Sequence, residues 1–187
     1  MTPDKARLIE LLLDLSYQKR KVVLASGRES DFYIDGKQTT LHAEGAAIIG
    51  RLVLEMIRTD PTITGVGGLS MGADPIATAT AIASTQDGGE HIHSFYVRKE
   101  AKGHGTQQYV EGLKNFPEGG RVVIVEDTST TGGSAYKAVE RSQSAGFEVA
   151  YVVTVVDRQE GARENLESKG VDFRALVTRE ELLAGSA

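Results

Sequence analysis

The sequence predicts an α/β fold in which a parallel sheet is covered by helices on both faces. From about residue 63 onward, short apolar runs alternate with segments of helical periodicity, an order typical of parallel strands joined by helical crossovers. The chain also contains 21 glycines, which concentrate where the apolar runs end. Ligands of such folds bind beyond the carboxyl ends of the strands, so the residues after each predicted strand are the candidates for a site.

The N-terminal part differs from the rest, because a helix and two short strands precede the regular alternation. Thr2-Pro3 is a suitable N-cap and first-turn pair for the first helix, which is expected to extend to about Lys19. Its apolar face consists of leucines at helical spacing: Leu8, Leu11, Leu12 and Leu15. The other expected elements of this part are strands at 22–24 and 32–34 around a polar turn at 26–30, and a helix at 42–58.

The regular part is predicted to supply the core sheet. Its strands are expected at residues 63–67, 92–97, 121–125, 148–156 and 171–176. Helices are expected after a cap at Asp74-Pro75, at 133–145, at 163–169, and after a capping box at residues 178–181. Residues 100–118 lack hydrophobic periodicity and are predicted to form a long loop. No linker or repeat interrupts the sequence, so a single domain over residues 1–187 is expected.

The composition excludes several classes of protein. Hydrophobic residues make up 40% of the chain and charged residues 25%, as in ordinary soluble domains. There is no cysteine, which excludes disulfides and thiolate metal sites and is compatible with a cytoplasmic location. The net charge of −5 argues against general nucleic-acid binding, and no apolar segment is long enough for a signal peptide or a membrane span. An anionic substrate must therefore be captured by a local basic cluster.

The segment after the strand at 121–125 carries the strongest functional signal. It places two acids, a run of hydroxyl residues and two glycines before a helix: Glu126, Asp127, Thr128, Ser129, Thr130, Thr131, Gly132, Gly133 and Ser134. Glycines let backbone amides approach a phosphate closely, a helix N-terminus favours an anion, and hydroxyls can donate to phosphate oxygens. The two acids can accept from vicinal ribose hydroxyls and stabilise positive charge in an oxocarbenium-like transition state. The alternative is a turn whose Ser and Thr residues only cap the helix; a Walker-type loop is disfavoured because no Gly-Lys-Ser/Thr follows.

Residues 126–134 resemble the PRPP-binding motif of the type I phosphoribosyltransferases, in which a hydrophobic strand leads into two acids and a Thr/Gly-rich loop. The resemblance implies the fold of that family, a five-stranded parallel core sheet flanked by helices with a small N-terminal hood. It divides the domain into the hood at about residues 1–40 and a PRPP-binding core at about 41–187. It also implies that every residue from Glu126 to Ser134 binds PRPP, but it does not indicate which base is used.

Three further segments resemble the orotate phosphoribosyltransferases in particular. The first, residues 24–35, contains Ser26-Gly27-Arg28-Glu29-Ser30 and is similar to the hood of that family, where the backbone of the following strand holds the pyrimidine edge. In isolation the same residues would suit a turn before an edge strand. Together with the motif at 126–134, the three segments occur in the order and spacing of the family.

The second segment, residues 96–105, resembles the catalytic loop of the family. It combines three cations and an imidazole with glycines, which suits a flexible loop that closes over a pyrophosphate leaving group: Arg98, Lys99, Lys102 and His104. The alternative is a solvated charged loop. Glu100 is the only acid between Arg98 and Gln108 of this acidic protein, which argues against that alternative.

The third segment is Asp157-Arg158-Gln159-Glu160-Gly161, at the end of the strand at 148–156. An arginine at a strand end can bind the carboxylate of orotate bidentately, which a purine-using relative would not need. The alternative is a surface ion pair of Arg158 with Asp157 or Glu160.

The resemblance implies an enzyme that joins orotate to the ribose 5-phosphate of PRPP and releases pyrophosphate. Lys102, His104 and Asp127 would be catalytic, Arg98 and Lys99 would also bind PRPP, and Thr130 and Arg158 would bind orotate. Magnesium would act as cofactor, mostly through PRPP oxygens and water, with no protein ligand firmly assigned. The expected assembly is a homodimer whose catalytic loop is shared between subunits, without nucleic-acid or membrane partners.

The chain departs from the family pattern at two positions. Many members carry lysine where this chain has Ala25, and many carry another lysine near Met71. Side-chain contacts from these two positions are therefore not expected. Two other functions stay open, a transferase for another base and a PRPP-sensing regulator without catalysis; Arg158 argues against the first, and the intact catalytic loop argues against the second.

Overall fold

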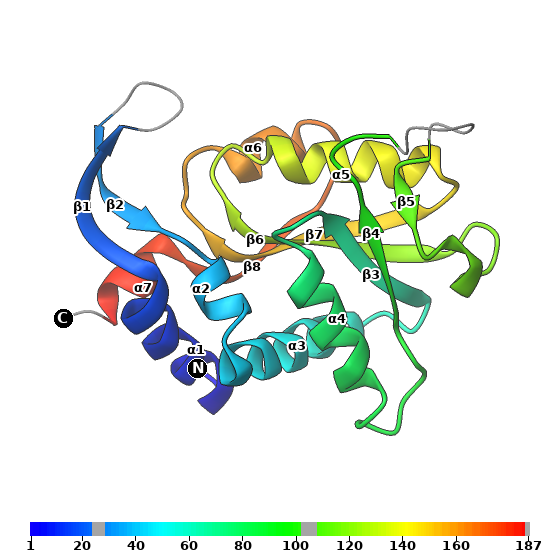
Figure 1. The fold of residues 1–187 in the computed structure, drawn as a ribbon, viewed down its shortest axis with the longest axis horizontal. Helices are drawn as coiled ribbons and strands as arrows, with labels where there is room; N and C mark the ends of the chain where they lie inside the picture. Colours follow the sequence, from blue (N-terminus) through cyan, green and yellow to red (C-terminus); the bar gives the residue numbers. More distant parts are fainter. Residues whose placement is uncertain (24–28, 102–107, 186–187) are drawn as a thin grey trace.

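The fold is built around a six-stranded sheet in the order β5-β4-β3-β6-β7-β8, shown in Figure 1. The computed structural model describes residues 1–23, 29–101 and 108–185. The strands are β3 (Ile63–Leu69), β4 (His93–Val97), β5 (Val110–Glu111), β6 (Arg121–Ser129), β7 (Glu148–Asp157) and β8 (Phe173–Thr178). All of them run parallel to their neighbours except β5, which pairs antiparallel with β4 at the edge. The predicted core of five parallel strands is confirmed.

Helices cover both faces of this sheet, and β6 shows how the sequence achieves it (Figure 1). Val123 and Val125 pack in the core with α1 (Pro3–Leu11), α3 (Ala43–Ile57) and α4 (Asp74–Ser84). Val122 and Ile124 pack in the opposite core with α5 (Gly133–Ser144) and α6 (Ala162–Glu167). Because successive side chains of a strand point to opposite faces, an unbroken apolar run is what a sheet covered on both sides requires.

The first helix ends earlier than predicted. After α1 the chain forms a π-helical turn (Leu12–Ser16) and then enters β1 (Tyr17–Val23), so the helix does not reach Lys19. A π turn inserts an extra residue and shifts the helical phase. As a result Leu15 is 38% exposed, whereas Ser16 is buried and shares a hydrogen bond of 2.6 Å with Thr39. The prediction of Leu15 on the buried face was wrong for this reason.

β1 pairs antiparallel with β2 (Glu29–Ile34), and the two strands form a separate hairpin that stands apart from the core sheet (Figure 1). This hairpin is the N-terminal hood that the resemblance implied, although both strands are longer than predicted. Residues 24–28, which include Ala25 and the predicted turn residues Ser26, Gly27 and Arg28, lie outside the described residues. After the hairpin, a short helix α2 (Lys37–Thr40) that was not predicted leads to α3.

Two other differences concern loops and strand ends. Residues 100–118 were predicted to be a loop throughout, but they contain β5 and the 3-10 helix at Leu113–Asn115. The strand predicted at 121–125 continues to Ser129, so both acids of the motif are strand residues rather than loop residues. β6 continues to Ser129 because β7 extends to Asp157 and pairs with it along this length. Glu126 pairs with Thr154, and Ser129 pairs with Asp157.

The remaining helices are close to the predictions. The cap predicted at Asp74-Pro75 differs in detail, because Asp74 already belongs to α4 and accepts a hydrogen bond of 2.9 Å from the Ser70 hydroxyl. The capping box before α7 (Arg179–Ala184) is confirmed, since Thr178 and Glu181 exchange side-chain to backbone hydrogen bonds. In the described part of the chain, no helix has the length and apolar character needed to span a membrane.

Candidate active site

A cavity of about 180 Å³ lies where β3 and β6 end. Its walls come from α2, the loop between β3 and α4, the segment after β4, the end of β6 and the start of α5. The lining residues are Lys37, Leu69, Ser70, Met71, Gly72, Lys99, Glu126, Asp127 and Ser134. The structure therefore brings four of the predicted site residues, Lys99, Glu126, Asp127 and Ser134, around one cavity at the predicted edge of the sheet.

Asp127 packs tightly between the backbone at Gly36 and the backbone at Gly72. A Cβ at Gly72 would lie 2.6 Å from Oδ1 of Asp127, and a Cβ at Gly36 would lie 3.2 Å from its Cβ. The side chain keeps 14% exposure, and its Oδ2 lies 3.5 Å from Nζ of Lys37. The carboxylate thus faces the cavity from a position that glycines on both sides make possible.

Glu126 has a different environment from its neighbour. Burial raises the pKa of Glu126 to about 7, the negative charge of Asp127 acts in the same direction, and a hydrogen bond from Ser129 opposes both. That hydrogen bond, from the Ser129 hydroxyl to Oε2 of Glu126, measures 2.8 Å. Glu126 is therefore partly protonated near neutral pH, whereas its strand neighbour is paired with a lysine.

The hydroxyl residues of the motif do not share one environment. The Ser129 side chain is buried and bound to Glu126, and the Thr128 hydroxyl is buried beside Gly36, with no hydrogen-bond partner among the described residues. Neither belongs to the lining of the cavity, and Thr130 does not either. Thr131, Gly133 and Ser134 are exposed at the start of α5.

The turn before α5 has the form of an anion site. Gly132 is the N-cap residue with a φ of 74°, a left-handed conformation that favours glycine, and it has no side chain with which to cap the helix. The side chain of Asn165 donates to the carbonyl of Thr131 at 2.7 Å and holds the turn from outside. Among the described residues, no Ser or Thr side chain caps α5 at its N-cap position, so the alternative of a purely helix-capping turn was wrong. The first amides of α5 face a turn rich in hydroxyl side chains.

The base of the predicted catalytic loop is anchored by a residue that the sequence did not single out. Arg141 donates from Nη1 to the carbonyls of Arg98, at 2.5 Å, and Lys99, at 3.1 Å. Its guanidinium also lies 3.9 Å from the ring centre of Tyr109. The Arg98 side chain forms an ion pair of 3.1 Å with Glu111 and does not line the cavity, whereas Lys99 does. Lys102 and His104 lie outside the described residues.

Arg158 lies at the end of β7, beneath the hood, and is not part of the cavity lining. Its Nη2 is 3.0 Å from Oε1 of Glu160 and donates to the carbonyl of Phe32 at 3.4 Å. The ion pair with Glu160 that the sequence left open is therefore present, but it is buried rather than on the surface. A substrate held by Arg158 would sit between the hood and the end of the sheet.

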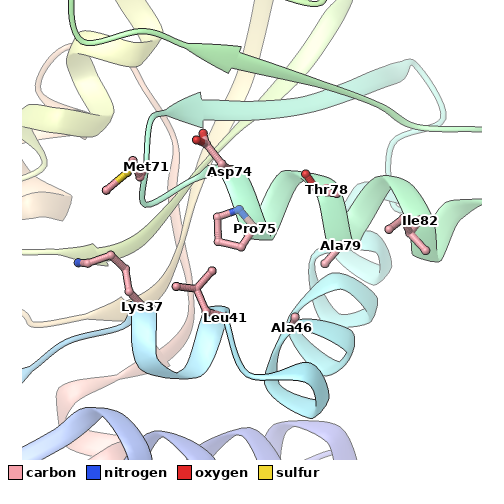
Figure 2. A pocket seen from close by; sticks show the side chains of 9 residues that line it. All are labelled: Lys37, Leu41, Ala46, Met71, Asp74, Pro75, Thr78, Ala79 and Ile82. Atoms are coloured by element: carbon pink, nitrogen blue, oxygen red, sulfur yellow. The ribbon is translucent and has the colours of Figure 1, made fainter.

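An apolar groove of about 530 Å³ adjoins the cavity (Figure 2). Figure 2 shows Leu41 directly after α2, Met71 before α4 and Ile82 further along α4, and these side chains are 71%, 71% and 55% exposed. Lys37 and Met71 line both the groove and the cavity. The face that exposes large apolar side chains is thus continuous with the candidate site.

Comparisons with known proteins show which family and fold the chain resembles. A family model described as a phosphoribosyl transferase domain matches residues 37–174. The orotate phosphoribosyltransferase of Nostoc sp. (strain PCC 7120) is 47% identical over 174 residues, which cover 93% of this chain and 82% of that protein. The crystal structure of Mycobacterium tuberculosis H37Rv orotate phosphoribosyltransferase in complex with Fe(III) dicitrate is similar at 46% identity and a TM-score of 0.81, covering 96% of this chain and 99% of that one. The same enzyme in complex with PRPP is similar at 42% identity and a TM-score of 0.77, with the same coverage.

Proposed function

Because this chain belongs to the phosphoribosyltransferase family and, within it, to the orotate phosphoribosyltransferases, we propose that it makes orotidine 5′-monophosphate and pyrophosphate from orotate and PRPP in pyrimidine nucleotide synthesis. One observation carries the proposal: the acidic end of β6 and the N-terminus of α5 line the same cavity. Glu126 and Asp127 stand at the start of the motif and Ser134 at its end, and all three are lining residues. Residues 1–40 would form the hood of a single catalytic domain and residues 41–187 its PRPP-binding core.

The acidic strand end suits the reacting ribose. A ring nitrogen of orotate loses its proton to solvent and bonds to C1 of PRPP, while the bond from C1 to the pyrophosphate oxygen breaks and positive charge develops on the ribose. Asp127, fixed between Gly36 and Gly72, accepts from the ribose hydroxyls and stabilises that charge. Glu126 is partly protonated because of its burial, so it can donate as well as accept beside the same hydroxyls.

The phosphates are bound at two places on either side of the ribose. The turn from Thr130 to Ser134 offers the first amides of α5 and exposed hydroxyls to the ribose phosphate, with Thr128 and Ser129 supporting the turn from the strand. Lys99 enters the cavity from the other side and meets the pyrophosphate. Arg98, Lys102 and His104 from the catalytic loop of the neighbouring subunit would complete the binding of the leaving group.

Magnesium fits the chemistry of this cavity. Asp127 and Glu126 present carboxylate oxygens, the hard donors that this ion prefers, next to the place where the phosphates would lie. The phosphates and water would supply the other ligands, with the two carboxylates secondary. The ion would offset charge on the leaving pyrophosphate, while the residues of the chain orient the ribose.

Orotate would lie under the hood, with its carboxylate on Arg158 and its ring near Thr130. The buried pair with Glu160 holds the guanidinium in a fixed orientation before the substrate arrives. An arginine so placed recognises a carboxylate, which adenine, guanine and hypoxanthine do not have. This observation favours orotate over another base.

The apolar groove supports a homodimer. Leu41, Met71 and Ile82 are large exposed apolar side chains on one face, and a second copy seated there would cover them. The groove shares Lys37 and Met71 with the cavity, so the partner's catalytic loop would be near the site that it is expected to complete. We place the dimer in the cytoplasm, where a pathway enzyme of this kind would act.

The test is an assay with purified protein, magnesium, PRPP and orotate that follows the loss of orotate absorbance. We expect turnover with orotate and little with adenine, guanine, hypoxanthine or uracil under the same conditions. Turnover with a purine in place of orotate would contradict the substrate assignment. PRPP binding by calorimetry without turnover of any base would favour the regulatory alternative.

A further inference from the structure

Lys37 enters the candidate site from a part of the chain that the sequence motifs do not include. It is the first residue of α2, directly after the hood, and its side chain lines the cavity opposite the end of β6. Nζ lies 3.0 Å from Oδ1 of Asp35 and 3.5 Å from Oδ2 of Asp127. The side chain is 45% exposed, so the ammonium group is at the cavity surface and accessible to a ligand.

The surroundings keep Lys37 charged and aimed at the cavity. The hydrogen bond to Asp35 and the negative charge of Asp127 hold the pKa of Lys37 above its ordinary value. Asp35 is itself fixed, because it accepts from the backbone amide of Lys37 at 3.2 Å and from the side chain of Gln38 at 3.1 Å. The ammonium is therefore anchored on one side and free to change its partner on the other.

The charges of the cavity show why an anionic substrate needs this lysine. Of the residues that line it, Lys37 and Lys99 are positive and Glu126 and Asp127 are acidic. The segment Ser70-Met71-Gly72 on the facing wall contributes no charge. With Lys37, the two cations of the lining match its two acids. If Lys37 were absent, Lys99 alone would face both acids, and a pyrophosphate group would meet a lining with more acidic than basic groups.

Resting on the proposed function, we propose that Lys37 is a PRPP-binding residue that donates to the pyrophosphate group. In the free enzyme it is the counter-ion of Asp127. When the ribose hydroxyls occupy the Asp127 carboxylate, the flexible stem of Lys37 lets Nζ turn to a pyrophosphate oxygen while Asp35 still holds it. Lys37 thus neutralises the Asp127 carboxylate before PRPP binds. After PRPP binds, the same ammonium group offsets charge on the pyrophosphate.

Two variants of Lys37 test this role. Lys37→Met removes the charge and keeps most of the length of the side chain, whereas Lys37→Arg keeps the charge. Lys114→Met is the matched control, because Lys114 is an exposed lysine in the 3-10 helix at Leu113–Asn115, outside the cavity lining. Each protein is titrated with PRPP and with inorganic pyrophosphate by calorimetry, and its KM for PRPP and for orotate is measured.

Loss of a charged hydrogen bond should weaken PRPP and pyrophosphate binding by Lys37→Met on the order of 10- to 100-fold, with the KM for PRPP rising in parallel. The KM for orotate and the melting temperature should change little. Lys37→Arg should recover most of the loss, and Lys114→Met should behave as the wild type. Pyrophosphate has no ribose, so its weaker binding cannot come from a changed contact between Asp127 and the ribose hydroxyls.

The opposite results overturn the assignment. If Lys37→Met binds pyrophosphate as the wild type does and only kcat falls, Lys37 serves merely to orient Asp127. A rise in the orotate KM instead of the PRPP KM would also contradict it. If the wild type binds PRPP more tightly than Lys37→Met but produces no orotidine 5′-monophosphate, the proposed function fails and the role of Lys37 stands.

Discussion

Nη2 of Arg158 lies 3.0 Å from Oε1 of Glu160, and only 10% and 8% of the two side chains are exposed. An exposed ion pair would leave the arginine mobile, but a buried pair that also contacts the Phe32 carbonyl gives the guanidinium one orientation. These contacts engage Nε and Nη2, and Nη1 is the nitrogen that we expect to meet the substrate carboxylate. Glu160 therefore fixes the orientation of Arg158, the residue that we propose binds the orotate carboxylate.

Replacement of Arg158 by alanine should raise the KM for orotate far more than the KM for PRPP. A hydrogen bond to a charged group is worth about 1.5–3 kcal/mol, so the expected rise in the orotate KM is on the order of 10- to 100-fold. Steady-state kinetics with each substrate varied in turn provide the measurement. Arg158→Lys is the matched variant, and it should recover only part of the affinity because a lysine lacks the planar guanidinium that Glu160 and the Phe32 carbonyl hold in one orientation. If the PRPP KM rises instead, Arg158 does not bind orotate.

The fold was largely readable from the sequence, because the central strands β6 and β7 are mostly apolar and alternate with segments of helical periodicity. Val122 to Val125 show the limit of that reading: the apolar run ends at Val125, but β6 continues to Ser129 because β7 offers pairing partners beyond that point. Such an extension depends on the neighbouring strand and leaves no pattern in the local sequence. The π turn at residues 12–16 was missed for a related reason, since a single inserted residue does not alter hydrophobic composition.

The site was readable only where its residues are contiguous. Glu126, Asp127 and Ser134 belong to one motif, and Lys99 belongs to a basic loop that stood out in an acidic chain. Lys37 and Arg141 reach the site through the fold, from segments whose local sequence suggests only a turn and an amphipathic helix. No spacing rule connects Lys37 with Asp127, because their approach depends on how the hood joins the core.

Asp127→Asn should reduce turnover strongly while the protein stays folded. The amide keeps the shape of the side chain between Gly36 and Gly72 but removes the charge that stabilises the transition state, so kcat should fall on the order of 100- to 1000-fold. The lost contact with Lys37 is partly exposed and should cost at most about 1 kcal/mol of stability. Kinetics and a melting curve on the same sample separate the two effects. Near-normal turnover would remove Asp127 from the mechanism.

Glu126 should make the stability of the enzyme depend on pH. Its pKa is 4.5 in an ordinary environment and about 7 in the folded protein, so between these values the unfolded chain releases a proton that the native state retains. The contribution of Glu126 to the free energy of unfolding is therefore greatest below pH 4.5 and falls as the pH rises to about 7, by roughly 3 kcal/mol in total. Glu126→Gln does not titrate and should not show this loss.

Urea unfolding of the wild type and of Glu126→Gln at about pH 4.5 and about pH 8 measures the effect. The stability of the variant relative to the wild type should increase from the lower to the higher pH. Glu118→Gln is the control, because Glu118 is exposed and outside the cavity lining. Parallel pH profiles for wild type and Glu126→Gln would show that Glu126 titrates in the folded protein as it does in the unfolded chain.

A mixed dimer tests whether the catalytic loop completes the neighbouring site. One subunit carries Lys102→Ala and the other Asp127→Asn. If the loop acts on the partner, the loop with Lys102→Ala reaches the site that carries Asp127→Asn, so one site has both defects. The other site then combines a wild-type Asp127 with a wild-type loop. The purified heterodimer should then keep about half of the wild-type activity, provided that the two sites act independently. A partner seated on the apolar groove would lie next to the cavity, because Lys37 and Met71 line both.

If the loop instead serves its own subunit, each site of the heterodimer carries one defect. Activity should then be close to that of the two mutant homodimers, and such a result would contradict a shared site. Differently tagged subunits allow the heterodimer to be isolated, and a wild-type heterodimer with the same two tags is the control. Ile82→Glu places a charge in the apolar groove and should shift the enzyme toward monomers in sedimentation experiments. A monomer that keeps full activity would show that each chain builds its site alone.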